Sequence, residues 1–409
     1  MRVIITALFS ISALAGIAQP GKYTLQQAID VALKNNAGIK AAAYQVESRK
    51  LLKQASFDIP KTNVSMLFGQ YNGFPNNDNN LTVTQAIPFT AFGSLAALDK
   101  SLFTSSQLKK AVTENELIYQ IKQNFHQLAF AKARHNLLIQ QDSIYEGFLK
   151  SASLRYKTGE SNLLEQVTAE TQRNDVRNQL RQNEATIIVL RTQLKTLLGI
   201  ETLPEISVGE FSELALNNLP DTTALNASPS LAFMRQQVEV AKNEKRLEVA
   251  RFAPDLQVGF FSQTLIDVAD AETGAVAGKS DRFTGFQLGL SIPLWFIPHQ
   301  AKVKAASFNQ QAAQSNYQYY QNTLHGQLQQ AAQQYIKNKN SLEYYRSSAL
   351  PNAELILKQS QIAFRGGEIG YAEYLLGVRN AIGIKEEYLQ TVNDCNQSII
   401  YIEFLSGVK

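Results

Sequence analysis

The chain has 409 residues, of which 44% are hydrophobic and 18% are charged, and it carries a formal net charge of +4. This length is sufficient for two ordinary domains or one long one, and the hydrophobic fraction allows a buried core. Because Lys and Arg are not clustered, the sequence excludes the basic patch of a nucleic-acid-binding protein. The single cysteine, Cys395, excludes a disulfide framework and a thiolate metal cluster.

The first 18 residues have the order of a secretory signal peptide. Arg2 precedes an apolar run from Val3 to Leu14, and small residues follow up to Ala18, where we predict cleavage. A membrane anchor would need about 20 apolar residues, more than this segment offers. Every later long stretch is broken by Lys, Gln, Asn or Asp. An exported chain of this kind is either soluble in the periplasm or inserted in a membrane as a β-barrel.

The chain contains an internal repeat. The run Leu154–Glu160 corresponds to Ile362–Glu368, 208 residues later, and the same offset relates Glu165 to Glu373. Upstream, Ile87 corresponds to Ile292 at an offset of 205, as expected if loops differ in length. We therefore predict a signal peptide at 1–18, a first repeat at 19–199, a linker at 200–227 and a second repeat at 228–409.

Each repeat predicts the same order of elements. In the first we expect helices at 24–57, 95–157 and 161–198, with two short strands near residues 64–68 and 81–84. In the second we expect helices at 229–252, 299–364 and 371–405, with strands near residues 256–260 and 286–292. Pro351 should kink the second long helix or end a segment there.

These lengths predict the fold class. A helix over 95–157 would span about 95 Å, far more than the helices of compact domains. Four strands do not close a barrel, whereas three copies supply twelve strands that enclose a lumen and leave no open edge in lipid. The expected fold is mainly α with a small β part, in which a long α-helical coiled-coil barrel continues a twelve-stranded trimeric transmembrane β-barrel.

The two helical turns carry a resemblance to a known family. The runs Tyr156–Ser161 and Phe364–Gly370, within the duplicated plan, resemble the TolC family of outer-membrane efflux proteins over essentially the whole mature chain. The run Gly367–Leu376 is most similar to the heavy-metal cation efflux branch. The resemblance implies a passive exit channel, not an enzyme, that lies in the cell outer membrane with its helical part in the periplasm. Implied partners are two further copies in a homotrimer, outer-membrane lipid, a periplasmic adaptor (membrane fusion protein) and an inner-membrane pump of the resistance-nodulation-division type.

The resemblance also implies site residues. The adaptor-docking tips would be Tyr156, Gly159, Glu160, Ser161, Phe364, Gly367, Glu368 and Ile369. At the entrance, the family often places two acidic residues after the second tip, and this chain has Glu373 at the first position and Leu376 at the second. Glu165 is the matching acid of the first repeat. Three copies of Glu373 would form an acidic ring that favours cations.

Other chemistries lack a sequence signal. The four histidines, His126, His135, His299 and His325, do not have the spacing of metal ligands, and no catalytic motif or phosphate loop is present. We therefore expect no catalytic residue, metal site, cofactor or nucleic-acid partner. The alternative is a soluble periplasmic coiled-coil protein of the adaptor type, which should carry one helical hairpin instead of two. An exported enzyme on a β-barrel is a third class, for which no site is found.

Overall fold

The computed structural model describes residues 23–72, 76–207, 209, 211–216, 219, 221–269 and 272–408. The predicted signal peptide, 1–18, lies outside them. The chain divides into two compact units. The first contains the described residues up to Asn36 together with Gln120–Ala215 and Asn338–Gln397, and the second contains Ala37–Tyr119, Leu216–Lys337 and the residues from Ser398 onward.

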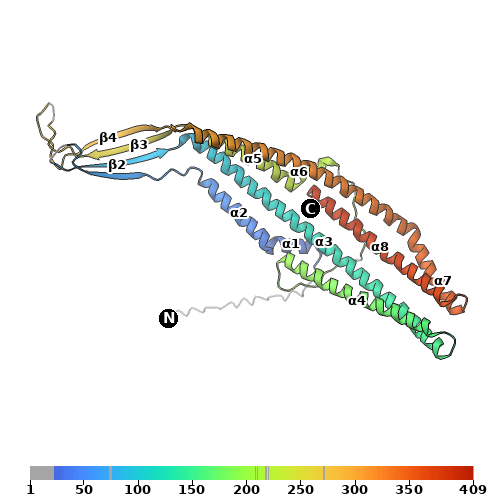
Figure 1. Cartoon of the computed structure of the whole chain (residues 1–409). Helices are drawn as coiled ribbons and strands as arrows, with labels where there is room; N and C mark the ends of the chain where they lie inside the picture. Colours follow the sequence, from blue (N-terminus) through green and yellow to red (C-terminus); the bar gives the residue numbers. More distant parts are fainter. Residues whose placement is uncertain are drawn as a thin grey trace, which may run out of the picture. The chain divides into compact units, whose positions relative to one another are not determined.

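The same order of elements occurs twice along the chain (Figure 1). The first series consists of α1 (Leu25–Asn35), α2 (Ala37–Gln54), β1 (Asn63–Gly69), β2 (Asp78–Ile87), α3 (Phe89–Lys157) and α4 (Leu163–Leu198). The second consists of the 3₁₀ helix η1 (Thr222–Ala227), α5 (Pro229–Ala250), β3 (Asp255–Gln263), β4 (Phe283–Ser291), α6 (Phe296–Tyr344), the π-helical turn η2 (Tyr345–Ala349), α7 (Leu350–Gly366) and α8 (Tyr371–Ser406). The predicted strands and the helices predicted at 95–157, 161–198, 229–252 and 371–405 are confirmed, with bounds shifted by a few residues.

The prediction of one helix over 24–57 is wrong, because the chain breaks between α1 and α2. Asn36 has an extended backbone, with ψ of 128°, and its N–H ends α1 by donating to Ala32. Its side-chain amide donates to the carbonyl of Leu197, 2.9 Å away, near the end of α4. Gly199, the αL cap of α4, packs so closely here that an added Cβ would lie 3.1 Å from the carbonyl oxygen of Asn35. A tertiary contact therefore stabilises the break.

The second long helix is also interrupted. The turn η2 immediately precedes Pro351, and within it the N–H of Leu350 donates to the carbonyl of Tyr345, five residues earlier. Proline has no N–H and its ring crowds the preceding turn, so a wider turn next to it relieves both problems. The expected effect of Pro351 is confirmed, and 299–364 is not one regular helix.

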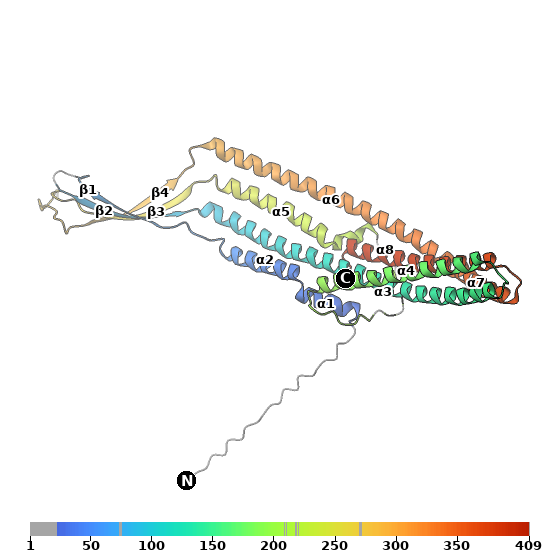
Figure 2. The same ribbon diagram turned by 60° about the horizontal axis from the view of Figure 1, so that its bottom comes forward.

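The second unit contains the only sheet among the described residues. Its strands are antiparallel in the order β1-β2-β3-β4, so β1 and β4 are its edges (Figure 2). The helical part of this unit has an apolar core contributed by η1, α5, α6 and α8. Its fully buried members are Leu225, Leu231, Leu324, Leu328, Ala331, Ile402 and Leu405.

The first unit has its own core, in which the hairpin α3–α4 packs against α8. This core consists of Leu138, Tyr145, Phe148, Ala152, Ala169, Val176, Tyr374, Val378 and Ile382. No helix in the described part of the chain combines the length and the hydrophobicity that a membrane span requires.

Candidate functional site

The turns of the two hairpins, α3–α4 and α7–α8, have the same backbone geometry. Gly159 and Gly367 both adopt the left-handed conformation, with φ of 78° and 74°. The N–H after each glycine donates to the carbonyl five residues earlier, at 2.8 Å for Glu160 and 2.9 Å for Glu368. This bond closes a Schellman-type helix end, which favours glycine because an L side chain is strained at positive φ. The repeated sequence therefore builds the same tip twice.

The helices that return from the tips begin differently. The side chain of Asn162 accepts from the N–H of Glu165 at 3.1 Å, which caps α4. The Glu165 side chain is largely buried and lies 3.3 Å from Nη1 of Arg155. At the start of α8 the carboxylate of Glu373 accepts from the N–H of Gly370 at 3.2 Å, and Glu373 remains exposed. The repeat-related carboxylates thus have different environments: Glu165 is largely buried beside a partly exposed Arg155, and Glu373 is an exposed cap.

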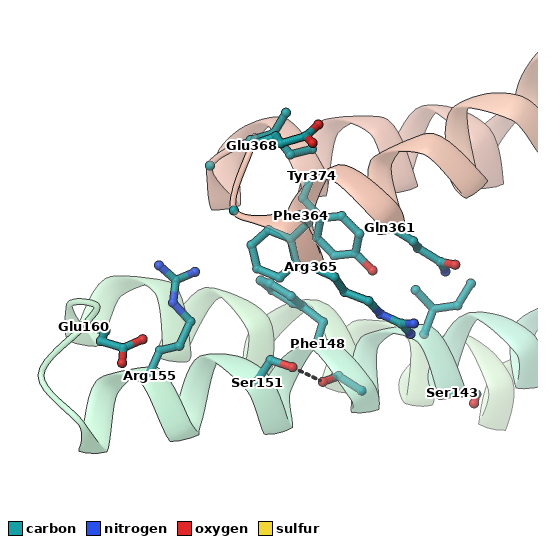
Figure 3. A pocket seen from close by; sticks show the side chains of 15 residues that line it. Ser143, Phe148, Ser151, Arg155, Glu160, Gln361, Phe364, Arg365, Glu368 and Tyr374 are labelled. Atoms are coloured by element: carbon teal, nitrogen blue, oxygen red, sulfur yellow. Dashed lines mark hydrogen bonds between the residues drawn. The ribbon is translucent and has the colours of Figure 1, made fainter.

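Four aromatic side chains join the two hairpins above the tips, and Figure 3 shows three of them, Phe148, Phe364 and Tyr374. Phe148 of α3 stacks on Tyr371 at 5.2 Å between ring centroids, and Phe364 stacks on Tyr374 at 4.5 Å. Phe148 also contacts Phe364 and Tyr374, and the guanidinium of Arg155 lies over the Phe364 ring at 5.9 Å. Burial raises the pKa of the Tyr374 hydroxyl, which stays protonated at neutral pH. We call the contact between α3 and α7–α8 the intrachain seam.

A groove of about 830 Å³ runs along this seam at the tips. Its floor is aromatic, and Arg155, Glu160, Arg365 and Glu368 place both signs of charge around it (Figure 3). Of the predicted tip residues, the groove brings together Glu160, Phe364, Gly367, Glu368 and Ile369. The remaining three, Tyr156, Gly159 and Ser161, belong to the first turn but do not line the groove, and Tyr156 is exposed.

The predicted entrance residues lie at the start of the two returning helices. Glu373 and Leu376 are both exposed on the first turns of α8, and neither lines the groove. Glu165 occupies the matching place on α4, inside its hairpin. Sequence reasoning missed the aromatic seam, since Phe148 has no repeat-related aromatic partner that could have drawn attention to it.

The sheet of the second unit has two unlike faces. The antiparallel register aligns Val64, Val83, Phe260 and Phe286 in one row across the four strands. Partners in a row point to the same side. Continuing by alternation, this face carries Met66, Phe68, Leu81, Val258, Leu256, Leu288 and Leu290. This apolar face is exposed in the single chain, since the side chains of Phe286 and Leu288 are 88% and 80% exposed.

Most residues on the opposite face of the sheet are polar or small, and Phe261, Leu67 and Phe283 are the exceptions. Its rows include Asn63–Thr84–Gly259–Gln287 and Ser65–Thr82–Phe261–Gly285. The ring of Phe261 covers Gly285, where an added Cβ would lie 2.6 Å from it.

Exposed aromatic residues mark all four places where a strand meets a helix. Phe57 precedes β1, Phe89 follows β2, Phe252 precedes β3 and Trp295 follows β4, and each of the four is exposed. In transmembrane β-barrels, girdles of aromatic residues border the apolar band at both membrane–water interfaces. These residues lie at the end of the apolar face nearest to the helices.

No protein-family model matches the chain, and the comparison with curated proteins gave no match. Solved structures do match. CusC, solved in a study of folding and transmembrane channel formation, aligns with a TM-score of 0.77 and 16% identity over 93% of this chain and 91% of that one. A membrane protein from Pseudomonas aeruginosa gives 0.78 and 16% over 94% and 93%. The outer membrane protein VceC from Vibrio cholerae gives 0.77 and 13% over 94% and 96%. The chain therefore has the fold of the outer-membrane efflux channels of the TolC family.

Proposed function

We propose that this protein is the outer-membrane exit channel of a tripartite efflux system. The observation that carries the proposal is the uncovered apolar face of the sheet, bordered by an exposed aromatic residue at each helix–strand junction. The strands β2, β3 and β4 have 10, 9 and 9 residues, close to the 9–11 that cross a bilayer when tilted. The apolar face would contact lipid and the polar face would line water.

The working form would be a homotrimer. A four-stranded sheet has two open edges, β1 and β4, which lipid does not satisfy. Pairing β4 of one copy with β1 of the next closes twelve strands in three copies, and a barrel of that size encloses a lumen. The helical part would then extend into the periplasm.

The hairpin tips would dock the adaptor that links this channel to an inner-membrane pump of the resistance-nodulation-division type. The groove at the tips supports this assignment, because its aromatic floor is bordered by both acidic and basic side chains. Central apolar contacts with a charged rim are the usual composition of a specific protein interface.

The substrate class would be heavy-metal cations. The resemblance of the run Gly367–Leu376 to the heavy-metal branch supports this class, as does the exposed carboxylate of Glu373 close to the tip. A strain that lacks the protein should become sensitive to metal cations while its tolerance of organic antibiotics is unchanged. Sensitivity to organic compounds alone would point to a different pump.

A pair of substitutions on one strand tests the channel proposal. Leu288 lies on the apolar face and its neighbour Gln287 on the polar face. Arginine in a lipid-facing position costs about 2–4 kcal/mol at the bilayer midplane, so Leu288→Arg should remove most of the protein from the outer-membrane fraction. Gln287→Arg should insert normally and change only the conductance. If wild-type protein fractionates with soluble periplasmic proteins, the adaptor-type alternative is correct instead.

A further inference from the structure

A second groove, of about 440 Å³, lies among the helices of the second unit. Its lining includes Ser94 of α3, Gln310 of α6 and, on α5, Lys242, Lys245, Arg246 and Val249. The four α5 residues have the spacing i, i+3, i+4 and i+7, which places them on one face of that helix. Three of the four are cations, and no acidic residue is among the lining residues. We call this site the basic groove.

The positive charge of the basic groove is only partly compensated within the chain. Lys242 pairs with Glu239 at 3.2 Å, but the two side chains are 40% and 50% exposed, so the pair is weak. Lys245 and Arg246 have no carboxylate partner among the described residues. The helix α6, which forms one wall, contains no Asp or Glu over residues 296–342. The groove is therefore suited to an anion.

The position of the basic groove fits the headgroup layer of a bilayer. The helix α5 ends at Ala250, the strand β3 begins at Asp255, and the exposed Phe252 lies between them. Arg246 and Lys245 precede Ala250 by four and five residues, which is about 6–8 Å along the helix. The headgroup region extends roughly 5–8 Å beyond the hydrocarbon core on each side. When β3 spans the hydrocarbon, the two cations therefore lie at the level of the lipid phosphates.

We propose that the basic groove binds the phosphate group of an anionic phospholipid in the membrane leaflet that faces the periplasm. The inference rests on the proposed outer-membrane channel, which brings the groove to that leaflet. Lys245 and Arg246 pair with the phosphate, while Ser94 and Gln310 donate hydrogen bonds to headgroup oxygens. Val249, which is 51% exposed and nearer to the sheet, contacts the start of an acyl chain. Basic pockets between helices at a membrane surface are typical sites for anionic headgroups.

Lipid binding to the purified protein tests the proposal. Mature protein in mild detergent is mixed with equal amounts of phosphatidylglycerol and phosphatidylcholine, and bound lipid is measured by native mass spectrometry. Wild type should bind phosphatidylglycerol preferentially. Lys245→Gln with Arg246→Gln should lower the affinity for phosphatidylglycerol at least tenfold, because each basic residue near an anionic surface contributes roughly fivefold. Lys245→Arg with Arg246→Lys keeps both charges and should retain the preference.

The matched control is Lys302→Gln with Lys304→Gln. Both lysines are exposed on α6 and do not line the groove, so removal of the same charge should change the affinity less than twofold. An equal loss in the control, or no lipid preference in wild type, overturns this inference and leaves the channel proposal standing.

Two further results separate other ligands from a lipid. Displacement of phosphatidylglycerol by an equal concentration of inorganic phosphate would show a site for a free anion. A changed anion conductance in the double glutamine variant, with unchanged lipid binding, would place the groove on the lumen. Either result overturns the inference without touching the channel proposal. Wild-type protein that fractionates with soluble periplasmic proteins overturns both.

Discussion

Two glycines set the geometry of the hairpin tips. At Gly159 and Gly367 no atom lies within 4 Å of an added Cβ, so the cost of a substitution comes from the backbone alone. A non-glycine residue at positive φ costs about 1–2 kcal/mol, and asparagine tolerates this region better than a β-branched residue. The sheet and the core of the second unit contain neither glycine, so we expect both to be unaffected.

We therefore expect Gly159→Val with Gly367→Val to abolish efflux complementation while the trimer stays in the membrane. The double asparagine variant should retain most of the activity. Complementation is scored as growth in the presence of the exported compound, and the trimer is assayed by unheated gel electrophoresis. Full complementation by the valine variant would show that the tips do not dock a partner.

The exposed carboxylate of Glu373 gives a second expectation at the residue scale. If three copies line a narrow entrance, Glu373→Gln should reduce cation preference in planar-bilayer conductance, most strongly at low salt where screening is weak. Glutamine keeps an oxygen that accepts from Gly370, so α8 remains capped. Leu376 does not supply a second acid, and we expect a shift in selectivity and not its loss.

Glu165→Gln is the matched control for the entrance. It neutralises the repeat-related acid, but this acid is buried against Arg155. The control should lower stability by about 1 kcal/mol, because Arg155 is partly exposed and solvent screens the pair, and it should leave selectivity unchanged. Equal selectivity for Glu373→Gln and wild type would place Glu373 outside the conduction path.

The local sequence predicted the two hairpin turns. The break at Asn36 and the aromatic seam were not predicted, because both depend on tertiary contacts. A glycine that ends a helix is a local signal, and it identified both turns. The break at Asn36 has no such signal. An asparagine inside an amphipathic pattern is compatible with a continuous helix, and only the hydrogen bond from its amide to the carbonyl of Leu197 explains the break. The aromatic seam was missed for a similar reason: Phe148 and Tyr371 are far apart in sequence and meet only when the hairpins pack.

The hairpins themselves depend on small residues at matching positions. In α3–α4 the fully buried pair is Ala152 and Ala169, and the repeat-related pair in α7–α8 is Ser360 and Gly377. A Cβ added at Gly377 would lie 3.1 Å from Cβ of Ser360 and would collide with its hydroxyl. These residues allow the two helices of each hairpin to approach closely.

Gly377→Leu should therefore destabilise the second hairpin by about 1–3 kcal/mol, the usual cost of overpacking. Gly383→Leu on the same helix is the control, because no atom lies within 4 Å of an added Cβ there. Thermal unfolding followed by circular dichroism should show a lower Tm only for the first variant. An equal change in both would mean that helix propensity, and not packing, dominates.

At the scale of the whole molecule, the open edges of the sheet are the strongest reason to expect association with other copies. Within the part of the chain that the structure describes, β1 pairs only with β2, and β4 pairs only with β3. Exposed backbone donors and acceptors at both edges, beside an uncovered apolar face, leave one chain incomplete in lipid. Closure of the sheet between copies should therefore provide most of the association energy.

The last prediction concerns the source of the association energy between copies. Protein purified in mild detergent should have three times the mass of one chain by light scattering corrected for bound detergent. Proline in the middle of an edge strand, at Leu67 of β1 or Leu288 of β4, removes a backbone N–H from that strand and should shift the mass toward the monomer. If the edge variants stay trimeric, the helices hold the copies together and the sheet closes only afterwards.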